Sequence, residues 1–146
     1  MARKRKYTVP IQLIELENEN YHILIEGFLK NGKSLQWVID TGASKTVFDA
    51  NLAEHFDPDE LEATEIQSAG IGEGHVETQT GILHEIYFGQ MSLSDWPVAI
   101  INLGHINKIY SQFTDIEIAG LLGSDFLLKH QCIIDFKNLQ ITLYVS

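Results

Sequence analysis

The fold is decided by residues 35–44, which read Leu35-Gln36-Trp37-Val38-Ile39-Asp40-Thr41-Gly42-Ala43-Ser44. The apolar half of this stretch predicts a strand that enters a protein core. An ionised Asp40 directly after such a strand is costly to desolvate. The residues that follow offer compensation, because hydroxyl groups and a sharp turn at glycine can direct hydrogen-bond donors at a carboxylate. The stretch therefore indicates chemistry that uses the Asp40 carboxylate.

The composition is that of a single globular domain. The chain has 146 residues, of which 45% are hydrophobic, and a chain of this length can bury roughly two-thirds of the surface that it exposes when unfolded. The formal net charge is −10, and four of the ten basic residues lie within residues 3–6. The rest of the chain is therefore strongly acidic, which argues against nucleic acid as a partner.

The cysteine and hydropathy patterns predict a cytoplasmic protein. Cys132 is the only cysteine, so neither an intramolecular disulfide nor a two-thiol metal site is expected, and a reducing compartment is favoured. Residues 7–12 follow the basic start without the continuous apolar segment of a signal peptide. The apolar runs are too short to span a bilayer.

Short runs rich in β-branched and aromatic residues predict an all-β fold. The expected strands are 8–16, 21–29, 35–39, 63–69, 75–80, 82–88, 91–103, 132–136 and 139–145. Asn31-Gly32 predicts a tight turn, and Pro97 predicts an edge or a bulge in its strand. Short helices are expected over 50–56, capped by Asp49, over 105–113, and over 126–130, capped by Ser124-Asp125.

Three motifs, in this order, resemble those of a retropepsin-like aspartic protease of the single-domain, homodimeric kind. They are Asp40-Thr41-Gly42-Ala43-Ser44, the glycine-rich Gly70-Ile71-Gly72-Glu73-Gly74, and Leu121-Leu122-Gly123 followed by Asp125-Phe126-Leu127. The resemblance covers roughly residues 21–145 and implies a closed, mostly antiparallel β-barrel with one or two short helices. Residues 1–20 are assigned to a basic tail and first strand, and residues 21–146 to the protease domain. The extra segment 103–116 is more typical of bacterial or cellular members than of compact viral ones.

The resemblance assigns roles to these residues. Asp40, Thr41 and Gly42 are expected to be catalytic, with the Thr41 hydroxyl locking the catalytic loops of a dimer together and the Gly42 N–H directed at the carboxylates. Ala43, Ser44 and the flap at 70–74 are expected to bind substrate, with Ser44 also hydrogen-bonded to the outer oxygen of Asp40. Leu121, Leu122 and Gly123 are expected to support the loop from behind. Asp125 is not placed in the catalytic pair.

The chemistry of such an enzyme explains why one Asp per chain suffices. Amide hydrolysis by carboxylates needs an ionised group that takes a proton from water and a protonated group that donates one, and two carboxylates in contact share a single proton. A homodimer supplies both copies of Asp40. The expected activity is aspartic endopeptidase cleavage of a peptide or protein substrate, without metal or cofactor; the alternative is a non-catalytic dimeric peptide-binding module.

Several of these residues also have simpler interpretations. Thr41 and Ser44 favour turns in any protein, and residues 70–74 could form a merely flexible hairpin. Glu73, His75 and Glu77 fit a solvated strand face better than a metal site. Cys132 lies in an apolar run and fits a buried structural thiol better than a nucleophile.

Overall fold

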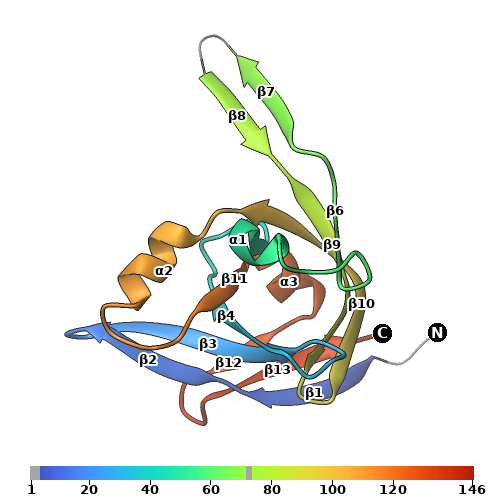
Figure 1. The fold of residues 1–146 in the computed structure, drawn as a ribbon. Coiled ribbons are helices and arrows are strands. Elements are labelled where there is room, and N and C mark those ends of the chain that lie inside the picture. The colour runs from blue at the N-terminus through green and yellow to red at the C-terminus, as the bar shows by residue number, and fades with distance from the viewer. Residues whose placement is uncertain (1–3, 72–73) are drawn as a thin grey trace.

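The computed structural model describes residues 4–71 and 74–146 and shows a mostly β protein with three short helices among them (Figure 1). The elements are β1 (Arg5–Pro10), β2 (Gln12–Glu17), β3 (Asn20–Phe28), β4 (Ser34–Ile39), β5 (Val47–Asp49), α1 (Ala50–Ala53), β6 (Leu61–Ala63), β7 (Gln67–Ile71), β8 (Gly74–Thr78), β9 (Thr80–Phe88), β10 (Met91–Ile101), α2 (Gly104–Tyr110), β11 (Ile118–Leu122), α3 (Ser124–Lys129), β12 (Ile133–Asp135) and β13 (Gln140–Val145).

The main sheet closes on itself, as predicted for a barrel. Its strands follow the order β2-β3-β4-β11-β5-β10-β9-β6, and an additional pairing joins β3 to β9 through Phe28 and Tyr87. Strands β3, β4, β11, β5, β10 and β9 therefore form a closed ring of six. Closure removes most of the exposed strand edges that would otherwise invite aggregation.

The hairpin of β3 and β4 delivers Asp40 to one end of the barrel. Gly32 has a φ of +87°, a conformation that favours glycine, and the Asn31 side chain accepts a hydrogen bond from the Lys33 amide at 2.9 Å. The strands pair antiparallel from Phe28 opposite Ser34 to Leu24 opposite Val38. The turn predicted at Asn31-Gly32 is confirmed.

Strand β11 enters the barrel between β4 and β5, although it comes much later in the chain. It runs parallel to β4, with Leu122 opposite Ile39, and antiparallel to β5, with Leu121 opposite Val47. Gly120 allows this close approach, because a Cβ there would lie 2.3 Å from the Val47 carbonyl oxygen. The two segments that resemble protease motifs thus lie side by side in the sheet.

The interior contains two hydrophobic clusters. The larger one centres on five aromatic side chains whose rings pack at centroid distances of 4.9 to 6.4 Å: Trp37, Phe48, Phe88, Trp96 and Phe126. The smaller cluster lies under α2 and includes Leu24, Val38 and Tyr110. Alternating residues of a strand face opposite sides, so Trp37 and Val38 contribute to different clusters.

The N-terminal segment belongs to the sheets. Strand β1 pairs antiparallel with β13 in a second sheet of order β1-β13-β12, and β2 pairs with β3. The single strand predicted over 8–16 is wrong, because the chain changes sheets at Ile11, whose amide donates to the Leu139 carbonyl oxygen at 3.0 Å. Pro97 pairs with Ile82 of β9 on one side, but β10 pairs with β5 only from Ala99 onward. The other side of the strand at Pro97 is therefore an edge, as predicted.

Strands β7 and β8 form a two-stranded arm that projects from the barrel (Figure 1). The predicted strand over 63–69 is wrong, since β6 ends at Ala63 and β7 begins at Gln67. The predicted flexible tip at 70–74 is also too long, because Gly70 pairs with His75 and Ile71 with Gly74. Gly72 and Glu73 lie outside the described residues.

The helices differ from prediction mainly at their ends. Asp49 caps α1 by accepting a hydrogen bond from the Asn51 amide, but α1 ends at Ala53, three residues before the predicted end. Helix α2 ends at Tyr110. The predicted cap at Ser124-Asp125 is wrong: α3 begins at Ser124 with Gly123 as its N-cap, and Asp125 lies in the first turn, where its carboxylate accepts from the Phe126 amide at 2.8 Å.

Candidate active site

Asp40 follows β4 and is held by its neighbours at one end of the barrel. Its backbone amide donates to the Leu122 carbonyl oxygen at 2.9 Å. Its half-buried carboxylate accepts a hydrogen bond from the Gly42 amide, 2.9 Å from N to Oδ1. The Ala43 amide closes the turn on the Asp40 carbonyl oxygen at 3.2 Å. The expected approach of the Gly42 N–H to the carboxylate is confirmed within one chain.

The other predicted residues of this loop face solvent or the supporting strand. Thr41, Gly42 and Ser44 are exposed, and Ala43 is half-buried. Among the described residues, no hydrogen bond joins Ser44 to Asp40, so the expected contact to the outer carboxylate oxygen is absent from the single chain. Thr41 is exposed to solvent on this loop.

The far end of the loop is fixed by Asp125, a role that the sequence analysis missed. Thr46 is only 1% exposed; its amide donates to Asp125 Oδ2 at 3.0 Å and its hydroxyl to Asp125 Oδ1 at 2.8 Å. The Gly123 amide donates to the same hydroxyl oxygen at 3.2 Å. Hydrogen bonds to a carboxylate are stronger than those between neutral groups. The sequence offers one signal for this arrangement, a carboxylate two residues after Leu122-Gly123.

The segment at Leu121, Leu122 and Gly123 passes directly behind the loop, as expected. Leu122 is fully buried, and the Ser124 amide donates to the Ala43 carbonyl oxygen at 2.7 Å. A Cβ on Gly123 would lie 2.6 Å from the Lys45 carbonyl carbon and 2.8 Å from the Ala43 carbonyl oxygen. Only glycine fits here, because the contacts are with backbone atoms.

A cavity of about 410 Å³ opens beside Asp40. Its lining residues are Leu16, Tyr21, His22, Ile23, Val38, Ile39, Asp40, Ile106, Ile109, Tyr110, Leu121 and Phe136. They come from β2, β3, β4, α2 and β11, and from the turn after β12. The cavity is mostly apolar with a few polar groups, which is typical of ligand sites. One wall of the cavity is formed by α2, which lies within the extra segment 103–116 noted in the sequence.

Two further residues of the cavity, His22 and Tyr110, were not predicted as site residues. The Tyr110 hydroxyl is hydrogen-bonded to His22 Nδ1, and their rings meet edge to face with centroids 5.5 Å apart. Burial, together with the negative charge of Asp40, raises the pKa of Tyr110 to about 12. The phenol therefore keeps its proton at neutral pH. The sequence predicted Tyr110 only as part of the helix over 105–113.

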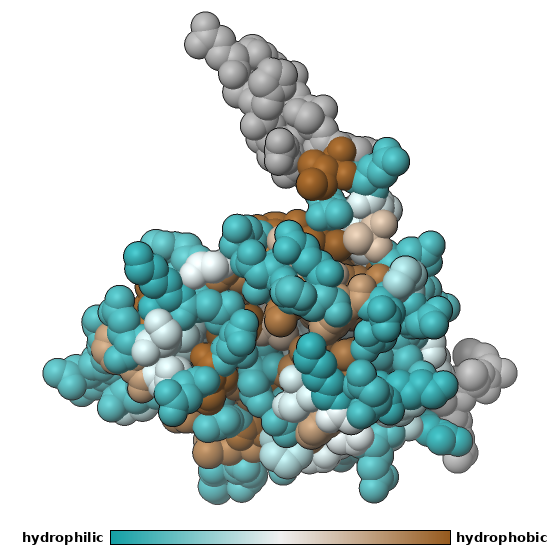
Figure 2. Space-filling view, viewed as in Figure 1, coloured by the Kyte–Doolittle hydropathy of each residue, from teal (hydrophilic) through white to brown (hydrophobic). Residues whose placement is uncertain are grey.

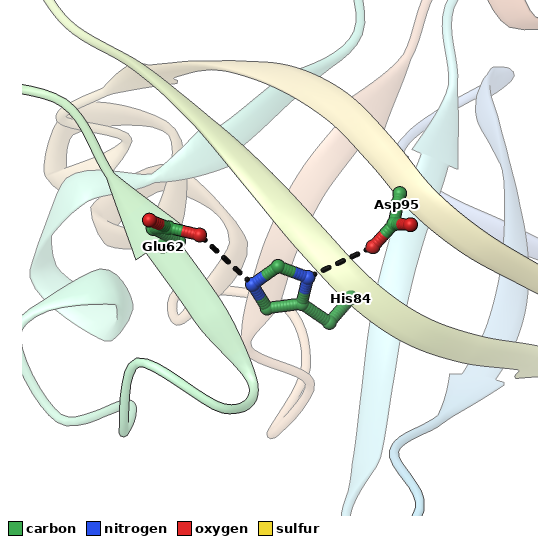
Figure 3. Close-up of polar contacts among 3 residues, drawn as sticks. All are labelled: Glu62, His84 and Asp95. Atoms are coloured by element: carbon green, nitrogen blue, oxygen red, sulfur yellow. Dashed lines mark hydrogen bonds and ion pairs between the residues drawn. The ribbon is translucent and has the colours of Figure 1, made fainter.

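A charged cluster ties the root of the hairpin arm to the barrel. His84 on β9 lies between Glu62 on β6 and Asp95 on β10 (Figure 3). Its Nε2 is 3.2 Å from Glu62 Oε2 and its Nδ1 is 2.9 Å from Asp95 Oδ1. Donation from both ring nitrogens requires the imidazolium form. The hydrogen bond with Asp95 raises the pKa of His84; partial burial opposes the rise and Glu62 adds to it.

The remaining candidate groups have structural roles. Cys132 is partly buried, and burial raises the pKa of its thiol to about 12, which fits the predicted inert thiol. Within residues 4–71 and 74–146, no group of three or more His, Cys, Asp or Glu side chains could hold a metal ion.

The longest described helix, α2, has seven residues, far fewer than the ~20 needed to cross a membrane. Hydrophilic side chains cover most of the face in Figure 2.

Comparisons with known proteins agree with this geometry. The family model described as "Aspartyl protease" matches residues 27–126. A crystal structure of a retropepsin-like aspartic protease from Rickettsia conorii is similar over 99% of this chain and 95% of that chain, with 19% sequence identity and a TM-score of 0.55. The retroviral protease-like domain of Ddi1 from Leishmania major covers 84% of this chain and 92% of its own, at 14% identity and a TM-score of 0.45.

No curated protein sequence matches the chain. The fold is retropepsin-like, and the family match spans the Asp40 loop, the hairpin arm and the segment behind the loop. Family and fold together support a protease-type function. This chain belongs to the aspartyl protease family.

Proposed function

We propose that the protein is an aspartic endopeptidase whose active site forms when the Asp40 residues of two chains meet in a homodimer. One observation carries the proposal: the half-buried Asp40 lines an apolar cavity, and its carboxylate accepts a hydrogen bond from the Gly42 amide. A carboxylate placed in this way is costly to keep unless it serves chemistry or binding.

The proposed mechanism follows from two carboxylates in contact. Like charges prevent both from ionising at once, so the pair shares one proton. The ionised member takes a proton from water while the oxygen of that water attacks the carbonyl carbon, and the protonated member donates to the carbonyl oxygen. One chain supplies a single Asp40, so two-fold symmetry is needed to complete the pair.

The surroundings of Asp40 support this assembly. The Asp40 carboxylate and the Thr41 hydroxyl lie on the same exposed turn, where a second copy of the turn could pack against them. The loop itself is anchored at both ends, by Leu122 at Asp40 and by Asp125 at Thr46. A rigidly supported loop can hold two carboxylates in register.

The hairpin arm of β7 and β8 is proposed to close over an extended peptide, with Gly70, Ile71, Gly72, Glu73 and Gly74 near the substrate backbone. Strand β7 of the arm follows the three-residue edge strand β6, and β8 leads through Gln79 into β9. Such closing elements exclude water and complete the site around the substrate. Ala43 and Ser44 are proposed to bind the substrate beside Asp40.

The decisive experiment compares purified wild-type protein with Asp40→Asn on a diverse peptide library read by mass spectrometry between about pH 3 and pH 8. Cleavage by the wild type and none by the variant is the expected result. Asp115→Asn is the control, because it makes the same chemical change at an exposed carboxylate of another loop. Cleavage by Asp40→Asn at the wild-type rate would rule out Asp40 as the catalytic group.

Sedimentation at micromolar concentration tests the shared active site separately. We expect a dimer under the conditions in which cleavage occurs. A protein that cleaves peptides as a monomer would rule out the shared pair of Asp40 carboxylates. A dimer that binds peptides without cleaving them would instead support the peptide-binding module.

A further inference from the structure

The cavity beside Asp40 has a polar end that an ordinary apolar pocket lacks. The register of β3 and β4 pairs Leu24 with Val38, and His22 and Asp40, two residues beyond them, both line the cavity. Side chains two residues apart point to the same face of a strand. His22 and Asp40 are therefore on the face that bears Leu24 and Val38, which α2 covers with Tyr110.

The pair formed by His22 and Tyr110 keeps hydrogen-bonding capacity in either arrangement of its protons. If the Tyr110 hydroxyl donates to Nδ1, the imidazole still has an N–H at Nε2 and the phenol oxygen can still accept. If Nδ1 donates, Nε2 can accept and the hydroxyl can donate. One donor and one acceptor remain in each case.

Apart from Asp40 and Tyr21, the rest of the cavity wall is apolar. Ile23 and Ile39 come from the barrel, and Ile106 and Ile109 come from α2. The volume, about 410 Å³, lies within the range of roughly 300–1,000 Å³ typical of small-molecule sites. An occupant of matching chemistry has a large apolar body and one hydrogen-bonding group.

We propose that this cavity is a substrate subsite next to the scissile bond and that the His22–Tyr110 pair makes it select tyrosine over phenylalanine. The inference rests on the proposed function, because it identifies the occupant as a side chain of the peptide that Asp40 cleaves. A phenylalanine would displace water from the pair without replacing its hydrogen bonds. A buried polar group left unpaired costs affinity.

The first test measures binding and needs no cleavage. The probes are N-acetyl-tyrosinamide and N-acetyl-phenylalaninamide, which differ by one hydroxyl group, titrated into the wild-type protein and followed by two-dimensional NMR. We expect the tyrosine probe to bind about threefold to tenfold more tightly, the effect of one net hydrogen bond. Shifted signals should include those of α2 and β3. Equal affinity of the two probes would overturn the proposal.

The second test assigns the preference to the pair. Tyr110→Phe removes one hydroxyl and keeps the ring, so the tyrosine and phenylalanine probes should bind this variant with about equal affinity. His22→Leu should do the same from the other side of the pair. Tyr87→Phe is the matched control, since its hydroxyl bonds to Glu85 outside the cavity, and it should keep the wild-type preference. A preference that survives in both pocket variants would also overturn the proposal.

Peptide cleavage separates this inference from the proposed function. A peptide that the wild type cleaves is resynthesised with tyrosine or phenylalanine on either side of the scissile bond, and the preference should appear mainly in KM. If Asp40→Asn still cleaves, the proposed function fails whatever the probes show. If Asp40→Asn is inactive but the two probes bind equally, the subsite assignment alone fails.

Discussion

Thr46 donates two hydrogen bonds to Asp125, from its amide at 3.0 Å and from its hydroxyl at 2.8 Å, although the two residues are 79 positions apart. The pair joins the end of the Asp40 loop to α3. The loop that carries the candidate catalytic group is therefore positioned by a residue that does not itself reach the cavity.

We expect Asp125→Asn to destabilise the protein by about 1–3 kcal/mol, because one of the two Thr46 donors then loses its carboxylate acceptor in a partly buried site. Cleavage should fall by about tenfold or more, since small misplacements of reacting groups are costly. Urea unfolding and peptide assays measure the two effects. Asp115→Asn, at an exposed position, is the control. If Asp125→Asn were as stable as Asp115→Asn, Asp125 would not anchor the loop through Thr46.

Gly123→Ala tests the close approach behind the loop. The new Cβ would meet backbone atoms of Lys45 and Ala43 at 2.6 to 2.8 Å, so the loop must move away from β11. Overpacking of this kind costs about 1–3 kcal/mol, and it should also weaken the hydrogen bond from Gly42 to Asp40. Thermal unfolding and cleavage assays provide the measurement. A variant with wild-type values in both would show that the loop tolerates the shift.

The cluster of His84, Glu62 and Asp95 should make stability depend on pH. The hydrogen bond with Asp95 raises the pKa of His84 in the folded protein; partial burial opposes this rise and Glu62 adds to it. The charged imidazolium therefore stabilises the fold, and this contribution is complete at pH values below the pKa of an unfolded histidine, about 6.5. That contribution is lost as the pH rises through the higher folded value. As the pH rises from about 6.5 through the pKa of His84 in the folded protein, we expect the melting temperature of the wild type to fall more than that of His84→Gln.

The exposed His55 offers a matched control for this experiment. His55→Gln should keep the wild-type dependence on pH, whereas Glu62→Gln should reduce it by removing one carboxylate from His84. Identical pH profiles for wild type and His84→Gln would show that the cluster contributes nothing to stability.

Local signals in the sequence predicted much of the fold. The turn at Asn31-Gly32, the cap at Asp49 and the strand that ends at Ile39 all depend on residues near one another in the chain, and each was found where expected. The predicted barrel followed from the resemblance carried by three separated motifs. The hydrogen bond from Gly42 to Asp40 was predictable because two positions separate its partners.

The misses involve residues brought together by the sheet. Asp125 was expected to cap α3, but it lies in the first turn of that helix and its carboxylate also binds Thr46. His22 was expected only as one position in a strand, and the folded barrel brings it to the same cavity wall as Asp40. Tyr110 was expected only within a helix, and its place on the cavity wall depends on how α2 packs on the barrel. No local pattern contains this information.

The late position of β11 in the chain also governs when the site can form during translation. The ribosome releases β4 and β5 well before Ile118–Leu122 exists to fill the space between them, and pairing between distant segments is the slow part of folding. Until Leu122 and Asp125 emerge, Asp40 and Thr46 lack their anchors. A nascent chain therefore carries the complete Asp40 motif before the loop around it has its supports.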